Sequence, residues 1–379
     1  MTRKEVYWEE IGVKAELSLF SVPEATDEIH VIVHVEPRDD GFTGELGRLN
    51  RGQHLLALLP EMACSQPVFK RYFLSDATNQ CPLMVKEKDC AVSYIQQPPL
   101  DGSRIALWGY YVKGVDIRCE NGMTMMNHNG YTHLWKMGMQ EHAGDSEMQT
   151  RTLLEKYERE LAQYDATLAD NCIRTWFFVR DVDSHYSGMV KARRENFMEQ
   201  GLTEKTHYIA STGIGGSPSD TRALVQFGSY ALKGFMPSQQ RYLYAPTHLN
   251  PTYEYGVTFE RGTCLDYGDR SHVLISGTAS INNKGEVMYI GDIYRQADRM
   301  CENVEKLLEE GGANYGNVMQ IVVYLRDIAD YKGMKRLFDE RFPDIPKVIT
   351  LAPVCRPTWL IEMECIAIVD KKNAKYRAF

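Results

Sequence analysis

The sequence predicts an α+β protein in which one folded unit is repeated three times, so that a single chain closes into a pseudo-trimer. Two observations carry this prediction. A long segment from the middle of the chain recurs near its end, and three successive stretches share one order of apolar strands and amphipathic helices. The length agrees, because 379 residues exceed one ordinary domain of about 100–200 residues. We place the units at residues 1–115, 116–235 and 236–379.

The repeat is clearest between residues 144–197 and 291–342. Matching residues are 147 positions apart at the start of the two segments and 145 positions apart at the end. A separation that drifts by one residue at a time indicates a duplicated unit with small changes in its loops. The matched pairs are Gly144 and Gly291, Gln149 and Gln296, Arg180 and Arg326, Gly188 and Gly333, and Phe197 and Phe342.

In each unit we expect the order strand, strand, helix, strand, helix, strand. In the third unit, strand 270–277 is followed by a helix at 292–311, whose apolar residues recur every three or four positions and form one buried stripe. A pair of glycines ends this helix. The strands 321–325 and 360–369 are rich in β-branched and apolar residues. Helices are therefore expected on one face of a sheet.

The other two units follow this pattern. In the second unit, the strand at 131–138 and the closing strand at 223–232 match their counterparts in the third unit. The first unit is a more divergent copy. Its matching helix, strand and closing strand are expected at 46–60, 69–76 and 104–114. Three such units can bury their sheets together in one ring.

The composition excludes several classes of protein. With 44% hydrophobic and 25% charged residues, the chain is neither disordered nor fibrous. Its formal net charge of −8, from 43 basic and 51 acidic residues, argues against non-specific binding to nucleic acid or to an anionic membrane. We find no apolar stretch that suits a membrane span or a signal peptide, and the nine scattered cysteines suit a reducing compartment. We therefore expect a cytoplasmic protein.

Motifs for a cofactor or a metal are missing from the sequence. The cysteines form no CxxC pair with zinc-like spacing, and the ten histidines form no HExxH motif. The glycine-rich patterns GxGxxG and GxxxxGK[ST], which bind dinucleotides and phosphates, do not occur either. We therefore expect no cofactor and no metal.

Four stretches of the third unit carry a family resemblance: HVLISGTASI, the helix leading into LLEEGG, VVYLRDIADYKGM and the closing IEMECIAIV. Together they resemble the YjgF/Rid family, also called RidA or endoribonuclease L-PSP. The resemblance implies a chorismate mutase-like fold, a trimer with sites between units, and action on enamines or imines. The family's catalytic arginine lies fifteen residues before the first glutamate of the closing strand, and here that position is Lys347. Lysine lacks the planar fork that grips a carboxylate, which counts against the usual Rid chemistry.

A second resemblance covers roughly residues 170–370. It rests on RTWFFV, VKARRENF, ASTGIGG, ISGTASI and VCRPTWLIEMEC. Together these stretches are similar to chorismatases, which are built on a YjgF-like core and release pyruvate from chorismate. The resemblance implies that Glu362 is the acid that protonates the enolpyruvyl group. It also implies that Cys355, seven residues earlier, marks the subgroup that forms 3-hydroxybenzoate.

The repeat supports Glu362 without reference to a family. In the aligned closing strands, Gln226 of the second unit and Ala106 of the first take its place, so only the third unit carries an ionisable acid there. The simpler alternative is a solvated glutamate on the outward face of a strand. A mostly apolar strand instead favours a buried acid with a raised pKa, as a general acid needs. For Cys355 the simpler alternative is a small buried hydrophobe.

A dicarboxylate substrate requires cations, and several arginines and a lysine fall in the matched stretches. The candidates are Arg174, Arg193, Arg194, Lys347 and Arg356. In the ASTGIGG loop, Thr212 and Gly213 offer a hydroxyl and backbone N–H groups that could bind substrate. The alternatives are surface salt bridges for the basic residues and a plain connection between strands for the loop.

Three functions remain open from the sequence. The first is a chorismatase-like hydrolase or lyase that releases pyruvate from chorismate or a related enolpyruvyl carboxylate. In it Glu362 is the general acid and Cys355 shapes the site for a hydroxybenzoate product. The second is a Rid-type enamine or imine deaminase, and the third is a non-catalytic YjgF-family binding protein. We expect a small carboxylate as the partner, no nucleic acid and no membrane, and either a monomeric pseudo-trimer or a low-order oligomer.

Overall fold

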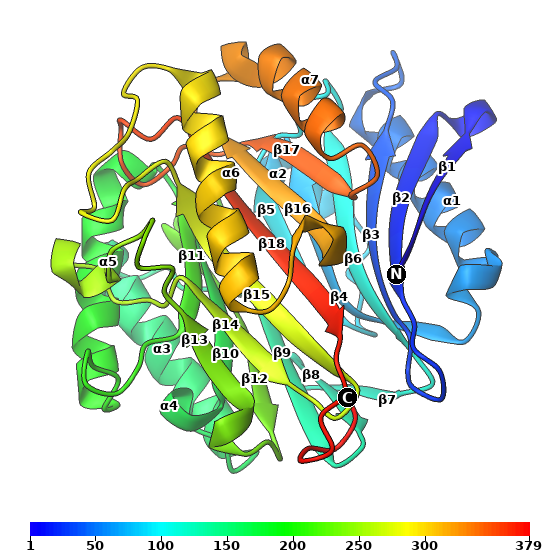
Figure 1. The fold of residues 1–379 in the computed structure, drawn as a ribbon. Helices are drawn as coiled ribbons and strands as arrows, with labels where there is room; N and C mark the ends of the chain where they lie inside the picture. The colour runs from blue at the N-terminus through cyan, green and yellow to red at the C-terminus, as the bar shows by residue number, and fades with distance from the viewer.

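The computed structural model describes residues 1–379, apart from the side chain of Tyr255, and shows three six-stranded sheets with helices (Figure 1). In all three sheets the neighbouring strands follow the same order, namely first, second, third, sixth, fourth and fifth in chain order. The fourth and fifth strands of each sheet run parallel, and the other neighbours run antiparallel. One topology that occurs three times confirms the predicted fold class, an α+β pseudo-trimer in one chain.

The strands of each sheet are consecutive in the chain. The first sheet contains β1 (Thr2–Trp8), β2 (Val13–Phe20), β3 (Glu28–Val35), β4 (Ser65–Leu74), β5 (Ala91–Gln96) and β6 (Ile105–Lys113). The second contains β7 (Asp116–Glu120), β8 (Met123–His128), β9 (Tyr131–Gln140), β10 (Cys172–Val179), β11 (Ala210–Gly215) and β12 (Val225–Lys233). The third contains β13 (Gln240–Leu243), β14 (Gly262–Asp266), β15 (Arg270–Ala279), β16 (Val318–Leu325), β17 (Lys347–Leu351) and β18 (Ile361–Asp370).

Helices follow the third and fourth strands of each sheet. They are α1 (Gly41–Ala57) and α2 (Ala77–Gln80) in the first unit, α3 (Ser146–Ala162), α4 (Leu168–Asn171) and α5 (Val182–Glu199) in the second, and α6 (Ile293–Glu310) and α7 (Tyr331–Arg341) in the third. The expected pattern of four strands per unit is therefore corrected to six. The additional strands include short ones such as β13 and β17, which carry too few residues for a clear alternation of polar and apolar side chains.

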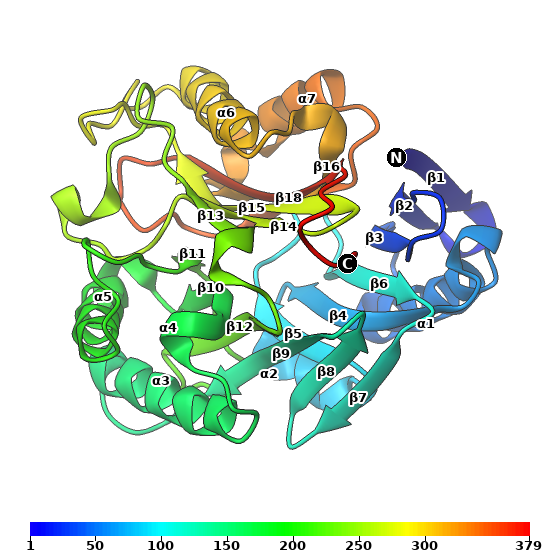
Figure 2. The same cartoon turned by 60° about the horizontal axis from the view of Figure 1, so that its bottom comes forward.

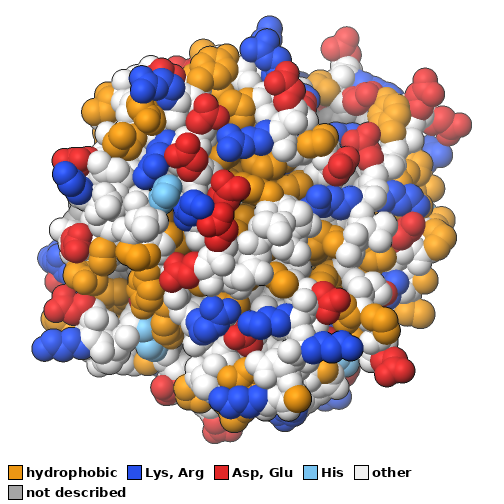
Figure 3. Space-filling view, in the orientation of Figure 1, with side chains coloured by type: hydrophobic (Ala, Val, Ile, Leu, Met, Phe, Trp, Pro, Cys, Tyr) orange, Lys and Arg blue, Asp and Glu red, His pale blue; other side chains and the backbone are white. Residues whose placement is uncertain are grey.

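The helices lie on the outside, and the three sheets face one another around a common centre (Figure 2). This arrangement buries both faces of the central strands, and all eight residues of β10 and of β16 are buried. Aromatic side chains from two units meet inside, because the ring of Phe69 stacks on Trp135 and Trp176 with centroids 5.7 and 6.3 Å apart. The units thus share one core. Acidic and basic side chains are interspersed on the face shown in Figure 3.

The units meet at three corners, each formed by the fifth strand of one unit and the early strands of the next. At the 2–3 corner, β11 lies against β15. At the 3–1 corner, β17 lies beside β3, since the ring of His34 contacts the carbonyl of Lys347. At the 1–2 corner, β5 lies against β9. These corners are the positions at which the resemblance to a trimeric family places its sites.

Candidate active site

Glu362 lies at the 2–3 corner, at the start of the central strand β18. In the sheet it pairs with Tyr324 of β16, as Gln226 pairs with Phe178 and Ala106 with Phe73 in the other units. The three positions are therefore equivalent, as the aligned closing strands predict. Because side chains two residues apart share one face of a strand, Glu362 and Glu364 point to the same side, and both are buried.

Glu364 is the centre of a buried hydrogen-bond network that joins all three units. Its carboxylate accepts hydrogen bonds from Arg71 of the first unit at 3.1 Å and from Arg174 of the second at 2.7 Å. The indole of Trp176 and the hydroxyl of Tyr324 each donate at 3.0 Å. Burial opposes ionisation, but the two guanidinium groups prevail and lower the pKa of Glu364. Glu364 is therefore an ionised, structural carboxylate.

Glu362, in contrast to Glu364, is protonated. Burial, followed by the charge of Glu364, raises its pKa to about 8, although Arg174 and Arg261 act in the other direction. No hydrogen bond joins its carboxyl group to another described residue. A methyl group on Gly277 would lie 2.1 Å from Oε1, so any larger residue there would force this carboxyl group to shift. Glu362 is therefore an acid that is mostly protonated near pH 7.

The carboxyl group of Glu362 opens onto a cavity between the second and third units. The lining residues are Tyr186, Arg193, Ser211, Gly213, Val257, Phe259, Arg261, Gly277, Ala279, Ile281, Cys355, Arg356, Trp359 and Glu362. They come from α5 and β11 on one side and from β15, β18 and three loops on the other. The free volume is about 30 Å³, which is room for one water molecule.

Five of the residues singled out from the sequence line this cavity together: Glu362, Cys355, Arg193, Gly213 and Arg356. Cys355 and Arg356 lie on the turn between β17 and β18, which brings them back over Glu362. Burial, followed by the charge of Glu362, raises the pKa of the Cys355 thiol to about 12. Cys355 is therefore a neutral thiol that shapes the cavity.

Arg174 and Thr212 lie beneath the cavity and do not line it. Arg174 donates to the Thr212 hydroxyl at 2.5 Å, and that hydroxyl donates to Glu364, also at 2.5 Å. The backbone N–H of Gly277 donates to the same hydroxyl at 2.9 Å. The structure thus places neither residue on the cavity wall, and the Arg174 guanidinium is already paired with Glu364.

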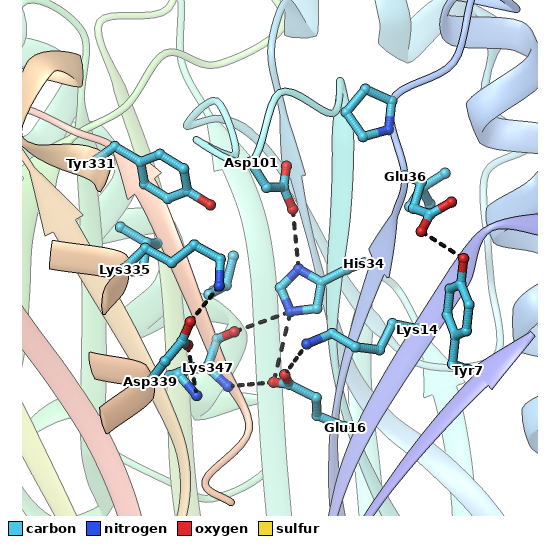
Figure 4. A pocket seen from close by; sticks show the side chains of 14 residues that line it. Tyr7, Lys14, Glu16, His34, Glu36, Asp101, Tyr331, Lys335, Asp339 and Lys347 are labelled. Atoms are coloured by element: carbon cyan, nitrogen blue, oxygen red, sulfur yellow. Dashed lines mark hydrogen bonds and ion pairs between the residues drawn. The ribbon is translucent and has the colours of Figure 1, made fainter. Parts of the chain in front are cut away.

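Arg194 and Lys347 lie away from Glu362, which corrects their predicted placement. Arg194 follows Arg193 on α5, and consecutive helical residues point about 100° apart, so Arg193 faces the cavity and Arg194 lines a separate groove. Lys347 starts β17, the strand with which the third unit meets the first, and it lines the cavity at the 3–1 corner (Figure 4).

Several lining residues were not singled out from the sequence as site residues. The main ones are Tyr186, Ser211, Arg261, Gly277 and Trp359. Arg261 donates from Nε and Nη2 to the carbonyl of Asn250, at 3.3 and 3.0 Å, which fixes its position. The alignment of repeats contained a signal for Tyr186, since Tyr331 stands at the same place two residues before the matched glycine of the third unit.

The other two corners lack an acid at the equivalent position. Gln226 donates to the hydroxyl of Ser93 at 3.0 Å and accepts from Gln140 at 2.8 Å, so a hydrogen-bonded amide occupies the 1–2 corner. Ala106 stands at the 3–1 corner. Among these three equivalent positions, only that of Glu362 can transfer a proton.

The part of the chain from residue 267 to residue 369 matches the family model described as endoribonuclease L-PSP. A RutC family protein of Pyrococcus abyssi is 33% identical over 97 residues, which cover 25% of this chain and 76% of that protein. The chain belongs to the RutC family. A 3-aminoacrylate deaminase RutC of Acinetobacter baylyi is 26% identical over 99 residues, which cover 26% of this chain and 79% of that protein.

A solved structure of a chorismatase matches far more of the chain. It superposes with a TM-score of 0.64 over 79% of this chain and 92% of that protein, at 16% sequence identity. The RutC-like unit is thus the third part of a larger architecture, and most of the chain has the fold of a chorismatase.

Two further features of the described residues concern metal ions and membranes. Among the described residues, no three His, Cys, Asp or Glu side chains gather in a way that could hold a metal ion. In the same part of the chain, no helix combines the length and the apolar character needed to cross a membrane.

Proposed function

We propose that the protein hydrolyses the enol ether of chorismate, or of a related enolpyruvyl carboxylate, and releases pyruvate, with Glu362 as the general acid. The observation that carries this proposal is a buried carboxyl group, protonated near pH 7, in a cavity that three arginines also line. The shared fold with a chorismatase supports the same reaction.

The reaction needs one proton donor and one water molecule. Glu362 donates its proton to the terminal methylene carbon, and the electron pair of the double bond forms the new C–H bond. The ether oxygen stabilises the oxocarbenium ion that results. Water adds to this cation and returns a proton to the Glu362 carboxylate. The hemiketal then collapses, the bond to the ring oxygen breaks, and pyruvate and a ring alcohol leave. Where the neighbouring ring hydroxyl attacks instead of water, a cyclic ketal forms. The bond from the ring to that oxygen then breaks, the ring loses a C–H proton and becomes aromatic, and the hemiketal collapses, so that this oxygen leaves as the carbonyl oxygen of pyruvate and the other stays on the hydroxybenzoate. Cys355 borders the cavity in which this occurs.

Arginines in the cavity are suited to hold the two carboxylates of the substrate. Arg193 and Arg261 are buried and face the cavity from opposite units, whereas Arg356 is exposed on its turn. The guanidinium of Arg356 lies over the ring of Trp359, 5.4 Å from its centroid. Because the free space holds about one water, a substrate has to displace lining side chains, and the exposed turn with Arg356 is the part best placed to move.

The test is release of pyruvate from chorismate, measured with a lactate dehydrogenase coupling enzyme. We expect activity in the wild type and a loss of about 10²–10⁴-fold in Glu362→Gln, which keeps the shape and removes the acid. Glu309→Gln, an exposed change on α6, is the matched control and should leave the rate unchanged. No pyruvate from the wild-type protein would overturn the proposal. Equal rates for wild type and Glu362→Gln would overturn the role of Glu362.

A second candidate function is a Rid-type deaminase, which the similarity to a 3-aminoacrylate deaminase RutC favours. At the 2–3 corner, however, the residue equivalent to Lys347 is Ser211. In the third sheet, Lys347 pairs with Ile321, which in turn pairs with Cys365 of the closing strand. In the second sheet, Ser211 pairs with Thr175, which pairs with Ser229 of the closing strand. Cys365 and Ser229 are 136 positions apart, as are the equivalent residues Glu362 and Gln226, so Lys347 and Ser211 are equivalent too. This corner therefore offers no cation at the family's arginine position. Ammonia release from 2-iminobutanoate tests this candidate, and a protein without either activity would be a binding protein.

A further inference from the structure

A second cavity lies at the 3–1 corner and is unrelated to the chemistry proposed for Glu362. Its free volume is about 290 Å³, close to the liquid volume of about ten water molecules. It lies between β2 and β3 of the first unit and α7 and β17 of the third. A cavity of this size can hold a small organic molecule without movement of its walls.

The fold places this cavity at the position equivalent to the Glu362 cavity. Tyr331 of α7 corresponds to Tyr186 of α5, since each precedes a matched glycine by two residues, and both line their cavities. Lys347 corresponds to Ser211, because the two residues hold the same place in the pairing of the fifth strand with the fourth. The closing strand contributes Ala106 here instead of an acid, so the ionisable group comes from a different strand.

That group is His34 on β3, which pairs with Ala106 in the sheet. Its Nδ1 lies 3.3 Å from a carboxylate oxygen of Asp101, and its Nε2 lies 3.1 Å from the carbonyl of Lys347 and 3.8 Å from Glu16 (Figure 4). Glu16 in turn accepts from the backbone N–H of Lys347 at 3.0 Å and from Lys14 at 2.5 Å. Burial of the ring lowers the pKa of His34, but the carboxylates of Asp101 and Glu16 outweigh this effect and raise the pKa to about 9. His34 is therefore a cation held between units.

The wall formed by α7 carries an uncharged hydroxyl group and charged side chains. Figure 4 shows the Tyr331 hydroxyl turned toward Asp101 and the Lys335 ammonium group. Among the described residues this hydroxyl has no hydrogen-bond partner. Lys335 pairs with Asp339, which also lies 3.5 Å from the buried ammonium group of Lys347. A ligand can therefore reach a hydroxyl and a cation on this wall.

The charges around the cavity balance. The cations are Lys14, His34, Lys335 and Lys347. The anions are Glu16, Glu36, Asp101 and Asp339. A ligand with a net charge would leave one charge uncompensated in a half-closed site. A zwitterion adds no net charge, and its carboxylate and its ammonium group each find a group of opposite charge in the cavity wall.

We propose that the 3–1 corner is a second ligand site, which binds a zwitterionic small molecule of the size of an amino acid. Its carboxylate lies between the Tyr331 hydroxyl and Lys335, and its ammonium group faces Asp101. The site is separate from the 2–3 corner, and occupation of one does not require the other.

The test is binding of the twenty L-amino acids, each at 10 mM, by thermal shift, followed by isothermal titration calorimetry of those that raise the melting temperature. We expect at least one amino acid to bind the wild type, and Tyr331→Phe and Lys335→Ala to weaken it at least fivefold. Tyr186→Phe, the same change at the equivalent corner, is the matched control and should leave the affinity unchanged. The amine and the carboxylic acid that each lack one charge of the amino acid should bind at least tenfold more weakly.

Three outcomes would overturn the proposal. The first is that none of the twenty amino acids binds. The second is that binding is lost in Tyr186→Phe and retained in Tyr331→Phe, which would place the ligand at the other corner. The third is equal binding of the amine or the carboxylic acid, which would exclude a zwitterion as the recognised class. Circular dichroism of each variant separates lost binding from lost folding, and Tyr331→Phe removes only a hydroxyl that has no partner among the described residues.

Discussion

Replacing Glu362 with glutamine should stabilise the fold at neutral pH while it strongly slows the proposed reaction. Burial, followed by the charge of Glu364, raises the pKa of Glu362 from 4.5 to about 8. In the unfolded chain this carboxyl group is ionised at pH 7, so the protein has to take up a proton when it folds. Stability is therefore lost as the pH rises from 4.5 toward 8, and at pH 7 the loss is about 3 kcal/mol, from 1.36 kcal/mol per pH unit. Glutamine avoids this loss.

Urea unfolding between pH 4.5 and 8.5 measures this difference. We expect Glu362→Gln to exceed the wild type by about 3 kcal/mol at pH 7 and by less than about 1 kcal/mol at pH 4.5. Glu364→Gln is the matched control two residues away. It leaves Arg71 and Arg174 without their buried carboxylate and should destabilise the protein by about 3–5 kcal/mol. If wild type and Glu362→Gln were equally stable over this range, the account of Glu362 as a buried neutral acid would be refuted.

Three further predictions concern single side chains. Gly277→Ala places a methyl group 2.1 Å from Oε1 of Glu362 and so displaces the proposed acid. The initial rate of pyruvate release should therefore fall about a hundredfold. An initial rate equal to that of the wild type would contradict this prediction. Cys355→Ala should keep the rate within about tenfold, because the thiol is neutral and no nucleophile, while chromatography of the ring products should show a changed ratio. His34 contributes about 3 kcal/mol of stability that is complete below pH 6.5 and is lost as the pH rises through about 9. The urea midpoint should therefore fall between pH 7 and 9.5 by more in the wild type than in His34→Gln, in which only the smaller loss from Glu362 remains.

The threefold architecture could be predicted because the repeat is written in the sequence. Offsets that drift by single residues aligned the second and third units, and the alignment of Glu362 with Gln226 and Ala106 agrees with the observed strand pairing. The first unit diverges more, and its second helix, α2, is a single turn at Ala77–Gln80. So short an element has no periodicity that a sequence could reveal.

The candidate site was predicted only in part, because it is assembled from two units. Cys355 and Arg356 lie on the turn that leads into the strand of Glu362, so closeness in sequence placed them correctly. Lys347 is also close in sequence, but β17 faces the first unit while the start of β18 faces the second. Spacing along the chain does not tell which corner a strand joins.

Helical phase explains the remaining difference at the site. Arg193 and Arg194 are neighbours in sequence, and the apolar pattern of α5 is too weak to say which of them faces inward. The structure buries Arg193 among the aromatic rings of Phe177 and Phe259, 5.6 and 5.9 Å from the ring centroids. Phe177 lies on β10 of the same unit and Phe259 on a loop of the third unit, and the sequence of α5 encodes neither contact.

The most direct test of the central claim is the pH dependence of pyruvate release from chorismate. If protonated Glu362 donates the proton, kcat/KM should be constant at neutral pH and fall tenfold per pH unit above an apparent pKa of about 8, the value in the free protein. Glu362→Gln should show only a residual rate without this descent. A wild-type rate that stays level to pH 9.5, or rises, would contradict the assignment of Glu362 as the general acid.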